Sequence, residues 1–421
     1  MQRVVLATIG SLGDVYPFIA VALRLRDLGL RPVLAAAEEY RGFAGSEGIA
    51  FEPIRPGAAD MKARGIDEAT AVRTVIGDAA GAFDLILPHF EDSFADCSRA
   101  IAGADLVIGS TFSIAARIAT ESAGIPFVTL MLQPIAFCSA EDPPIIKEAR
   151  FLPWLRRRFG TGPIRLIYAL GRTRFRSRRR PVDDLRRRLG LPEVRDELIE
   201  GPLRAEKLFA LFPPAFAPLP ADAPTHAQSA GFSFYNGRQA ASDELDPELA
   251  RFLDEGSPPL VFTLGSLAVF APADFYETSA AVARRLKQRA VLLVGEHAVA
   301  GLRHLEDERI KVMGYAPHRL LFPRAAAVVH HGGIGTTAQA LRAGAPQLVA
   351  PVLGDQFDNA ERLRRLGVAE VVPLERYSAE RAARALKKAL ESSRVRELAP
   401  AMSRVDGPAV VAEWVAGRLS R

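Results

Sequence analysis

The sequence predicts an α/β protein made of two doubly wound, Rossmann-like domains that face each other across a cleft. Short apolar runs rich in Val and Leu alternate with helical patterns in both halves of the chain, as in parallel sheets covered by helices. The chain has 421 residues, and a single core stops growing near roughly 250–300 residues. Two domains are therefore expected.

The first half of the chain begins with a strand, a turn, a helix and a second strand. An apolar run at residues 4–8 leads into the turn-forming stretch Gly10-Ser11-Leu12-Gly13-Asp14, and Pro17 stands where the first turn of a helix tolerates it. Apolar residues then recur at helical spacing until Gly29. Further runs typical of buried strands follow at residues 32–36, 105–109, 127–132 and 207–212.

The second half repeats this alternation after a stretch dense in proline. We expect strands at residues 260–264, 290–294, 310–313, 326–330 and 347–350, and helices at 275–286, 336–343, 357–366 and 409–419. Proline restricts the backbone, so residues 213–224 are typical of a semi-rigid linker. We predict an N-terminal domain over residues 1–214, a linker over 215–228, a C-terminal domain over 229–400 and a terminal helix within 401–421.

The composition excludes several classes of protein. With 49% apolar and 24% charged residues the chain is neither disordered nor fibrous, and two cysteines cannot form a disulfide framework or a four-ligand zinc site. No apolar run approaches the roughly 20 residues that cross a bilayer, and a Gly-rich turn follows the first strand too soon for a signal peptide. We expect a cytoplasmic protein.

The net charge of +5 is concentrated in one stretch. Nine arginines lie from Arg172 to Arg188, and three more stand at residues 156–158. A solvated helix face accounts for such a cluster without any partner. The alternative is peripheral contact with anionic lipid at the inner face of the membrane, because apolar residues at 166–170 accompany the charge. Nucleic acid is not expected, because no known binding module is visible.

The strongest functional signal lies between Tyr315 and Asn359. A predicted strand ends at His330-His331 and continues through Gly332-Gly333-Ile334-Gly335-Thr336-Thr337 into a helix. Glycine lets a ligand approach the backbone, and the free N–H groups and dipole of a helix start favour an anion. Asp355-Gln356 follows the next strand, at the edge where open α/β sheets bind ligands, and a carboxylate beside an amide suits sugar hydroxyls.

This stretch resembles the donor-binding signature of GT-B glycosyltransferases of the UDP-glycosyltransferase superfamily. The segment Gly10-Ser11-Leu12-Gly13-Asp14-Val15-Tyr16-Pro17 is similar to the start of their bacterial branch. Other segments resemble its rhamnosyltransferase-like, natural-product group: Gln133-Pro134 with Asp142-Pro143-Pro144, Phe262-Thr263-Leu264-Gly265-Ser266, and the stretch from His331 to Thr337. The resemblance covers most of the chain and implies the GT-B fold, a nucleotide-sugar donor and a terminal helix that crosses back to the first domain.

The resemblance assigns donor-binding roles to residues of the second half. Those matched to diphosphate binding are His331, Gly333, Gly335, Thr336, Thr337, Gly265 and Ser266. Tyr315 occupies the position of a base-stacking Trp and His318 that of a base-reading Gln, while Asp355 and Gln356 match the pair that holds the donor sugar.

One residue at the expected ribose site differs from the pattern of the family. Gln339 stands where many members have a Glu that grips both ribose hydroxyls, and an amide grips a diol less strongly than a carboxylate does. The sequence therefore leaves the donor open between a UDP-sugar and a dTDP-sugar.

The catalytic base is expected in the first loop, because an acceptor hydroxyl must lose its proton as it attacks the anomeric carbon. Many relatives have a His there, whereas this sequence has no His before His89. Bacterial relatives with Gly-Asp in this loop are thought to use the Asp, so the resemblance implies that Asp14 is the base. The alternative reading is that Asp14 caps the helix or shapes the turn.

No metal or other cofactor is expected. The Asp-x-Asp by which GT-A enzymes hold a metal is absent, and His330 and His331 would point to opposite sides of a strand end. In a metal-free site, His331 and the helix start would stabilise the departing diphosphate. His330 is interpreted as a packed or hydrogen-bonded neighbour.

Acceptor contacts are the least determined part of the site. Ser11, Ser110 and Gln133 follow strands of the first half, near the edge where ligands bind, although a turn-closing role accounts for each equally well. Three aromatic residues could line an apolar acceptor pocket or belong to the core: Phe137, Phe151 and Trp154.

The resulting hypothesis is an inverting, metal-independent glycosyltransferase. It would move a hexosyl group from a UDP- or dTDP-sugar to a hydroxyl of a lipophilic, lipid or natural-product acceptor. One alternative is a nucleotide-sugar epimerase, whose second set of acid/base carboxylates is not found. Another is a non-catalytic partner of a second glycosyltransferase, which could lose Asp14, Asp355 and Gln356, all present here. The oligomeric state is left open.

Overall fold

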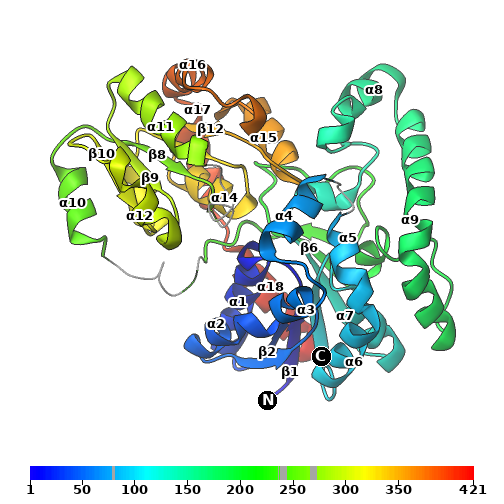
Figure 1. The fold of residues 1–421 in the computed structure, drawn as a ribbon. Helices are drawn as coiled ribbons and strands as arrows, with labels where there is room; N and C mark the ends of the chain where they lie inside the picture. The colour runs from blue at the N-terminus through cyan, green and yellow to red at the C-terminus, as the bar shows by residue number, and fades with distance from the viewer. Residues whose placement is uncertain (78–80, 236, 238–243, 266–272) are drawn as a thin grey trace. The chain divides into compact units, whose positions relative to one another are not determined.

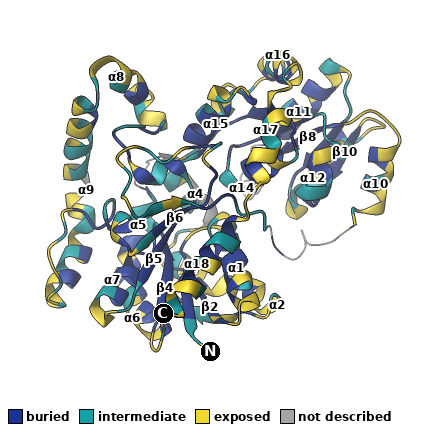
Figure 2. Ribbon diagram, turned by 180° about the vertical axis from the view of Figure 1, so that it is seen from behind, coloured by how far each residue is buried: buried dark blue, intermediate teal, exposed yellow. Residues whose placement is uncertain are grey.

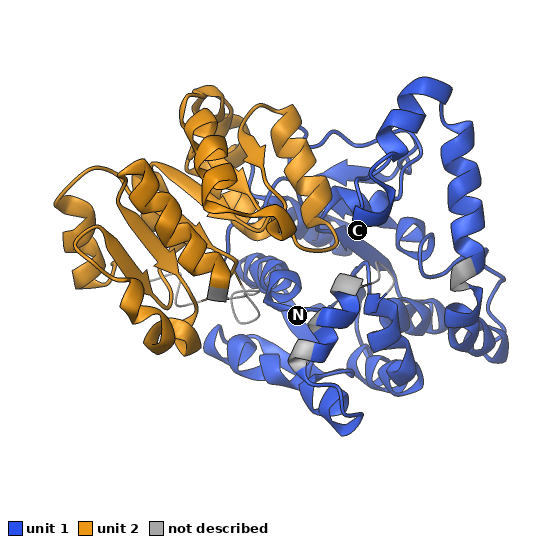
Figure 3. Ribbon diagram, turned by 45° about the horizontal axis from the view of Figure 1, so that its top comes forward, with its two compact units in different colours: residues 1–235, 405–421 blue, residues 236–404 orange. Residues whose placement is uncertain are grey.

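The computed structural model describes residues 1–77, 81–235, 237, 244–265 and 273–421. The chain forms two compact units (Figure 3). Unit 1 comprises Met1–Tyr235 and Val405–Arg421, and unit 2 comprises Asn236–Arg404. Each unit is an all-parallel sheet covered by helices (Figure 1), so both halves have the predicted doubly wound architecture. In the described part of the chain, no helix is both long and apolar enough to span a bilayer.

The sheet of unit 1 has seven strands in the order β3-β2-β1-β4-β5-β6-β7. The strands are β1 (Arg3–Ala7), β2 (Arg31–Ala36), β3 (Ala50–Pro53), β4 (Leu106–Ser110), β5 (Phe127–Met131), β6 (Lys207–Ala210) and β7 (Ala227–Ser229). The order reverses between β1 and β4, which pair in parallel. The carboxyl ends of these two strands mark the switch point where such sheets bind ligands.

The helices of unit 1 cover both faces of this sheet. They are α1 (Leu12–Asp27), α2 (Arg41–Ser46), α3 (Ala58–Ala63), α4 (Glu68–Gly77), α5 (Gly81–Ile86), α6 (Phe90–Ala100), α7 (Ile114–Ala123), α8 (Leu152–Phe159), α9 (Gly162–Arg188) and α18 (Gly407–Leu419). Successive residues of β1 point to opposite faces. Val4 and Leu6 join the core beside α1 and α18, whereas Val5 and Ala7 join the core beside α6 and α7. The central strands β4 and β5 are buried throughout (Figure 2).

The C-terminal helix α18 is part of unit 1. Val411, Ala412 and Val415 are fully buried in the core that contains α1. The ring of Trp414 lies edge-on to Phe209 of β6, with 5.8 Å between the ring centroids. Polar contacts hold both ends of the helix, because Arg24 pairs with Asp406 and Gln2 Nε2 donates to the Leu419 carbonyl oxygen at 2.6 Å.

The sheet of unit 2 has six strands in the order β10-β9-β8-β11-β12-β13. They are β8 (Leu260–Thr263), β9 (Ala290–Leu293), β10 (Ile310–Met313), β11 (Ala327–His330), β12 (Gln347–Val349) and β13 (Ala369–Val371). The helices are α10 (Pro247–Asp254), α11 (Ala273–Leu286), α12 (Val299–Leu302), α13 (His318–Leu321), α14 (Ile334–Arg342), α15 (Gln356–Arg365), α16 (Ala379–Leu390) and α17 (Arg394–Ser403). The order reverses between β8 and β11, so the ends of these strands form the second switch point.

The units divide at positions different from those predicted. The proline-rich stretch at residues 215–228 is not a linker but belongs to unit 1, and its end enters strand β7. Phe216 and Ala217 are buried, and the ring centroids of Phe216 and Phe232 lie 5.4 Å apart. The density of proline predicted a semi-rigid linker, whereas apolar residues between the prolines pack into the unit.

Candidate active site

The start of α14 in unit 2 is shaped by glycines. The chain leaves β11 at His330 and turns through Gly332, whose φ of +93° favours glycine. A Cβ on Gly332 would lie 2.9 Å from Val349 Cγ1 and 3.1 Å from the Gln356 carbonyl oxygen, so any other residue would collide with β12 and α15. Gly333 then caps α14 without a side-chain hydrogen bond, which leaves the first N–H groups of the helix available to an anion.

His330 is held by hydrogen bonds on both ring nitrogens. Its Nδ1 accepts from the Gly332 N–H at 3.1 Å, so Nε2 carries the proton and donates to Gln347 Oε1 at 2.9 Å. Burial lowers the pKa of His330 to about 4, which keeps the ring neutral near pH 7. His330 therefore fixes the turn between β11 and α14 and has no ring nitrogen left for a ligand.

His331 occupies a narrow slot between two glycines. A Cβ on Gly265 would lie 2.8 Å from its Cε1, and a Cβ on Gly333 would lie 2.3 Å from its Nε2. The side chain is 7% exposed, and its Nδ1 is buried with no hydrogen-bond partner among the described residues. Burial, followed by the nearby His330 and His318, lowers the pKa of His331 to about 3. A neutral ring with an unused nitrogen at a helix start is suited to donating one hydrogen bond to an anion.

The other residues predicted at the diphosphate site differ in exposure. Thr336 and Thr337 are buried in the first turn of α14, and Thr337 Oγ1 has no hydrogen-bond partner among the described residues. Gly335 faces open space, with no atom within 4 Å of a Cβ built on it. The backbone N–H of Gly265 donates to Thr263 Oγ1 at 3.1 Å, and Ser266 lies outside the described residues.

The two residues predicted to bind the donor sugar, Asp355 and Gln356, have different surroundings. Gln356 is buried, and its Oε1 accepts from the backbone N–H groups of Val352 (2.8 Å) and Leu353 (3.2 Å). The amide oxygen of Gln356 therefore holds the loop after β12, and the sugar-binding role of Gln356 stays a prediction. Asp355 is half-buried and accepts from Asn359 Nδ2 at 2.8 Å.

Asn359 is a site residue that the sequence analysis did not select. Its Nδ2 also donates to the carbonyl oxygen of Gly332 at 3.0 Å, so it connects the start of α15 to the glycine turn. Its Oδ1 is buried without a hydrogen-bond partner in the described part of the chain. The signal that could have identified Asn359 is its position four residues after Asp355, on one face of a helix.

The residues predicted to bind the nucleotide base lie around α13. Tyr315 is 36% exposed, with its ring centroid 6.3 Å from that of His318. His318 stacks on Phe322 at 4.3 Å, and burial lowers the pKa of its imidazole to about 4. Gln339, predicted at the ribose, is 3% exposed within α14, so little of its amide is accessible. The open ring of Tyr315 is the part of this group that a planar base can reach.

In unit 1, Asp14 stands in the first turn of α1, the helix that follows β1. Its Oδ2 accepts from the Ser11 N–H at 2.9 Å and from Ser11 Oγ at 3.2 Å, which completes a capping box. Its Oδ1 makes no hydrogen bond to a described residue. Burial raises the pKa of Asp14, against the lowering effect of Ser11. The capping role is thus observed, and the second oxygen is unused.

The predicted acceptor residues have mostly structural contacts. Ser110 is buried and bonds to Ser113 Oγ at 2.8 Å, while Ser113 Oγ donates to the Ala7 carbonyl oxygen at 2.7 Å, closing the ends of β1 and β4. Ser11 is the N-cap of α1. Gln133 is half-buried, and its side chain makes no hydrogen bond to a described residue. Gln133 alone of these three retains its full hydrogen-bonding capacity.

The aromatic residues considered for an acceptor pocket separate into two groups. Phe137 is 6% exposed and lies edge-on to Phe212, so it belongs to the core. Phe151 and Trp154 are 50% and 55% exposed on α8.

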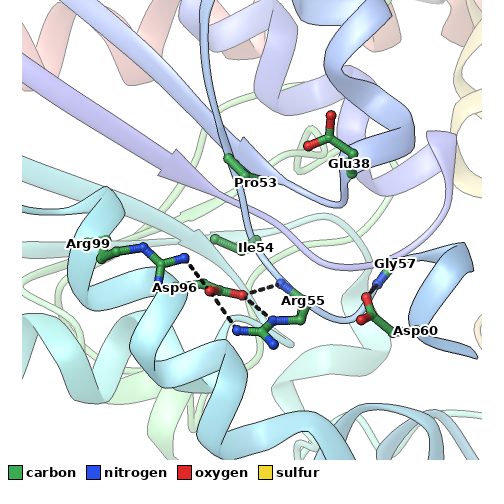
Figure 4. Close-up of a pocket in the computed structure, with 8 residues that line it drawn as sticks. All are labelled: Glu38, Pro53, Ile54, Arg55, Gly57, Asp60, Asp96 and Arg99. Carbon is green, nitrogen blue, oxygen red and sulfur yellow. Dashed lines mark hydrogen bonds and ion pairs between the residues drawn. The ribbon is translucent and has the colours of Figure 1, made fainter. Parts of the chain in front are cut away.

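A hollow on unit 1 lies away from these residues (Figure 4). Asp96 stands at its centre and accepts from Arg55 Nε at 2.7 Å and from Arg99 at 2.5 Å, while Asp60 accepts from the Gly57 N–H at 2.8 Å. These charges satisfy one another, so the hollow is a structural ion-pair cluster rather than a ligand site. Among the described residues, no group of three or more His, Cys, Asp or Glu is arranged to hold a metal ion.

Comparisons with known proteins cover both units. Residues 4–159 match the glycosyltransferase family 28 N-terminal domain, and residues 279–410 match the erythromycin biosynthesis protein CIII-like C-terminal domain. The O-mycaminosyltylonolide 6-deoxyallosyltransferase of Streptomyces fradiae is 31% identical over 405 residues, which cover 92% of this chain and 90% of that protein. The chain is a GT-B glycosyltransferase of the UDP-glycosyltransferase superfamily.

Two further comparisons agree with this membership. The vancomycin aglycone glucosyltransferase of Amycolatopsis orientalis is 30% identical to the glycosyltransferase over 434 residues, covering 100% of this chain and 98% of that protein. The fold is similar to the crystal structure of the glycosyltransferase VinC in complex with dTDP, with a TM-score of 0.69, 21% identity and coverage of 99% of this chain and 100% of that one. The family and the fold class expected from the sequence are confirmed.

Proposed function

We propose that this glycosyltransferase transfers a sugar from a UDP- or dTDP-sugar to a hydroxyl of a lipophilic natural product, with inversion and without a metal ion. The observation that carries the proposal is His331, whose buried Nδ1 lacks a partner among the described residues beside the uncapped start of α14. The named activities of the Streptomyces and Amycolatopsis relatives support the acceptor class, and the dTDP bound to VinC supports a dTDP-sugar as one of the two donors.

The diphosphate is assigned to the start of α14. A neutral His331 would donate one ring N–H to a phosphate oxygen, and the free backbone N–H groups after Gly333 would donate others. These fixed donors stabilise negative charge as it develops on the leaving diphosphate, which is the task that a metal ion performs in other glycosyltransferases. Gly335 leaves open space for a phosphate at this turn.

The proton of the acceptor is assigned to Asp14. Ser11 fixes one carboxyl oxygen in the capping box, while Oδ1 makes no hydrogen bond to a described residue and can accept the proton. The raised pKa of Asp14 makes the carboxylate a stronger base than an exposed one. As the acceptor oxygen bonds to the anomeric carbon, the bond from that carbon to the β-phosphate oxygen breaks, and the diphosphate leaves with the electron pair. A single displacement inverts the configuration.

Nucleotide binding tests the proposal directly. We would titrate the protein with UDP and with dTDP by calorimetry in the presence of EDTA, and repeat the titrations with His331→Ala. We expect one nucleotide to bind the unmodified protein without metal, and the variant to bind it at least tenfold more weakly, a loss of about 1.4 kcal/mol. If neither nucleotide binds, the donor assignment is wrong and the auxiliary-partner alternative gains support. If binding requires Mg²⁺, the metal-free mechanism is wrong.

A further inference from the structure

Helices α8 and α9 are consecutive and lie at the edge of unit 1 (Figure 1). Both expose large apolar side chains. We use the name α8–α9 surface for the exposed residues of α8 and of the first half of α9. The apolar members are Phe151, Trp154, Phe159, Leu166 and Leu170, and the basic members are Arg157, Arg158 and Arg165. The apolar side chains are 50–61% exposed, which is unusual for five large residues so close in sequence.

These side chains are not needed to hold the two helices together. Leu152 of α8 and Ile164 of α9 are buried and form a small core with Ala140. Leu166 and Leu170 are four residues apart and share a different face of α9 from Ile164. The rings of Trp154 and Phe159 contact each other edge to face, with 6.0 Å between centroids. The helices therefore pack through one set of apolar residues and present a second set to the outside.

The charged residues of α8 and of the first half of α9 are all arginines, of which Arg156 pairs with Glu141 and Arg172 with Glu200. From residue 149 to residue 182 the sequence contains eleven arginines and no aspartate or glutamate. Arg157 and Arg165 are exposed and form no ion pair with any described residue. The guanidinium of Arg158 lies 5.5 Å from the centre of the Phe159 ring. The exposed apolar groups are thus bordered by cations that the described part of the protein does not neutralise.

The arginines nearer the end of α9 differ from those of the α8–α9 surface in their partners. The segment from Arg172 to Arg188 was the one considered for lipid contact, and most of its charge is neutralised within the unit. The ion pairs there join Arg172 to Glu200, Arg178 to Asp84, Arg179 to Asp183, Arg186 to Glu121 and Arg188 to Glu91. Four of these pairs join α9 to other parts of unit 1, whereas Arg179 and Asp183 both lie on α9.

We propose that the α8–α9 surface docks on the surface of a membrane that contains anionic lipids. Aromatic and leucine side chains would enter the boundary between headgroups and acyl chains, and Arg157, Arg158 and Arg165 would contact phosphate groups. Arginine suits this position because its apolar stem can lie along the apolar surface while its guanidinium reaches phosphates. Docking through this surface does not depend on the proposed donor, acceptor or base.

Vesicle co-sedimentation of the full chain tests the proposal. We compare vesicles of phosphatidylcholine with vesicles of phosphatidylcholine and phosphatidylglycerol in equal parts. We expect binding to the anionic vesicles, weakened by added salt because screening reduces attraction between exposed charges. Each arginine near such a surface contributes about 1 kcal/mol, so Arg157→Gln with Arg165→Gln should weaken binding about tenfold or more. Trp154→Ser should also weaken it.

The matched control is Arg180→Gln with Arg187→Gln, which removes the same net charge from exposed positions in the other half of α9. This double variant should bind nearly as well as the unmodified protein. Equal losses in the two double variants would mean that net charge alone drives binding and would overturn the proposal. Equal binding to the neutral vesicles, or no binding to either kind, would also overturn it. Circular dichroism of each variant checks that the fold is retained.

Discussion

At the residue scale, the observed capping contacts of Asp14 are compatible with its proposed role as the catalytic base. Its Oδ2 accepts both hydrogen bonds from Ser11, and Gly10 leaves room for this oxygen, because a Cβ on Gly10 would lie only 2.3 Å from it. The same contacts fix the orientation of the carboxyl group, and Oδ1 is left without a described partner. Such a cap would position the carboxylate for the proposed proton transfer and would not compete with it.

The variant Asp14→Asn separates the two roles. An amide oxygen can still accept from the Ser11 N–H, so the cap should survive and stability should change by less than about 1 kcal/mol. The amide cannot accept the acceptor proton, so kcat should fall about 10²- to 10⁴-fold while nucleotide affinity is unchanged. Steady-state kinetics and calorimetry on the same preparation measure both.

Ser11→Ala is the matched control for Asp14→Asn. It removes the hydroxyl from the cap but keeps the carboxylate, so it should cost about 1 kcal/mol of stability and leave turnover within a few fold. Near-normal turnover in Asp14→Asn would show that Asp14 is only a cap.

Two neighbouring histidines should make stability depend on pH. Burial lowers the pKa of His330 to about 4 and that of His331 to about 3, whereas both titrate near 6.5 in an unfolded chain. Below pH 6.5 the unfolded chain therefore binds protons that the folded protein does not, and stability falls as the pH decreases towards 4. At pH 5 the loss is about 2 kcal/mol for each histidine.

Urea unfolding followed by circular dichroism between pH 7 and pH 5 measures this dependence. His331→Asn should have a shallower pH dependence than the unmodified protein, because one of the three histidines whose pKa is lowered by burial, His318, His330 and His331, is gone. An unchanged slope would show that His331 does not contribute to it.

At the element scale, the start of α14 is defined by its glycines, which differ in what surrounds them. Gly335 has open space around it, so Gly335→Ala should stabilise the helix by about 0.5 kcal/mol. The added methyl group would occupy the space proposed for a phosphate, and nucleotide affinity should fall about tenfold or more. A variant that is more stable but binds nucleotide more weakly would support the phosphate position at this turn. Thermal unfolding measures the stability, and calorimetry measures the nucleotide affinity.

Gly301 in α12 provides the control for this variant, since it too has no atom within 4 Å of a built Cβ. Gly301→Ala should leave nucleotide affinity unchanged. If Gly335→Ala binds nucleotide normally, the phosphate does not approach this turn of α14.

Five strands of unit 2 could be predicted from the sequence because their apolar runs are short, continuous and bounded by glycine or proline, whereas β13 and helices α10, α12, α13, α16 and α17 were not predicted. The strand expected at residues 326–330 is Ala327–His330, and the helix expected at 336–343 is Ile334–Arg342. Strand β7 was missed because three residues, Ala227–Ser229, carry no apolar alternation.

The side-chain contacts of the site were harder to predict than its position. A motif places Gln356 after β12, but the use of its Oε1 depends on how the loop at Val352 and Leu353 folds back. Likewise, Ser110 is enclosed by a network that reaches Ala7, more than 100 residues away in sequence. Local sequence patterns do not contain such long-range contacts.

At the scale of the whole molecule, the chain leaves unit 1 after Tyr235 and re-enters it at Val405, so unit 1 is completed by the last part of the chain. Both tryptophans, Trp154 and Trp414, belong to unit 1. Tryptophan fluorescence therefore reports the unfolding of unit 1 alone, while circular dichroism reports both units.

Val411→Asp uses this arrangement to test the role of α18. Val411 is fully buried in the core shared with α1, and a carboxylate there has no partner, so unit 1 should lose about 3 kcal/mol or more. The fluorescence transition should shift to lower urea, although residue 411 follows unit 2 in sequence. Gly417→Asp adds the same charge at an exposed position of α18 and should leave the transition in place. Val411→Asp could instead leave the fluorescence transition in place and shift only the circular dichroism transition. In that case α18 stabilises unit 2 rather than unit 1.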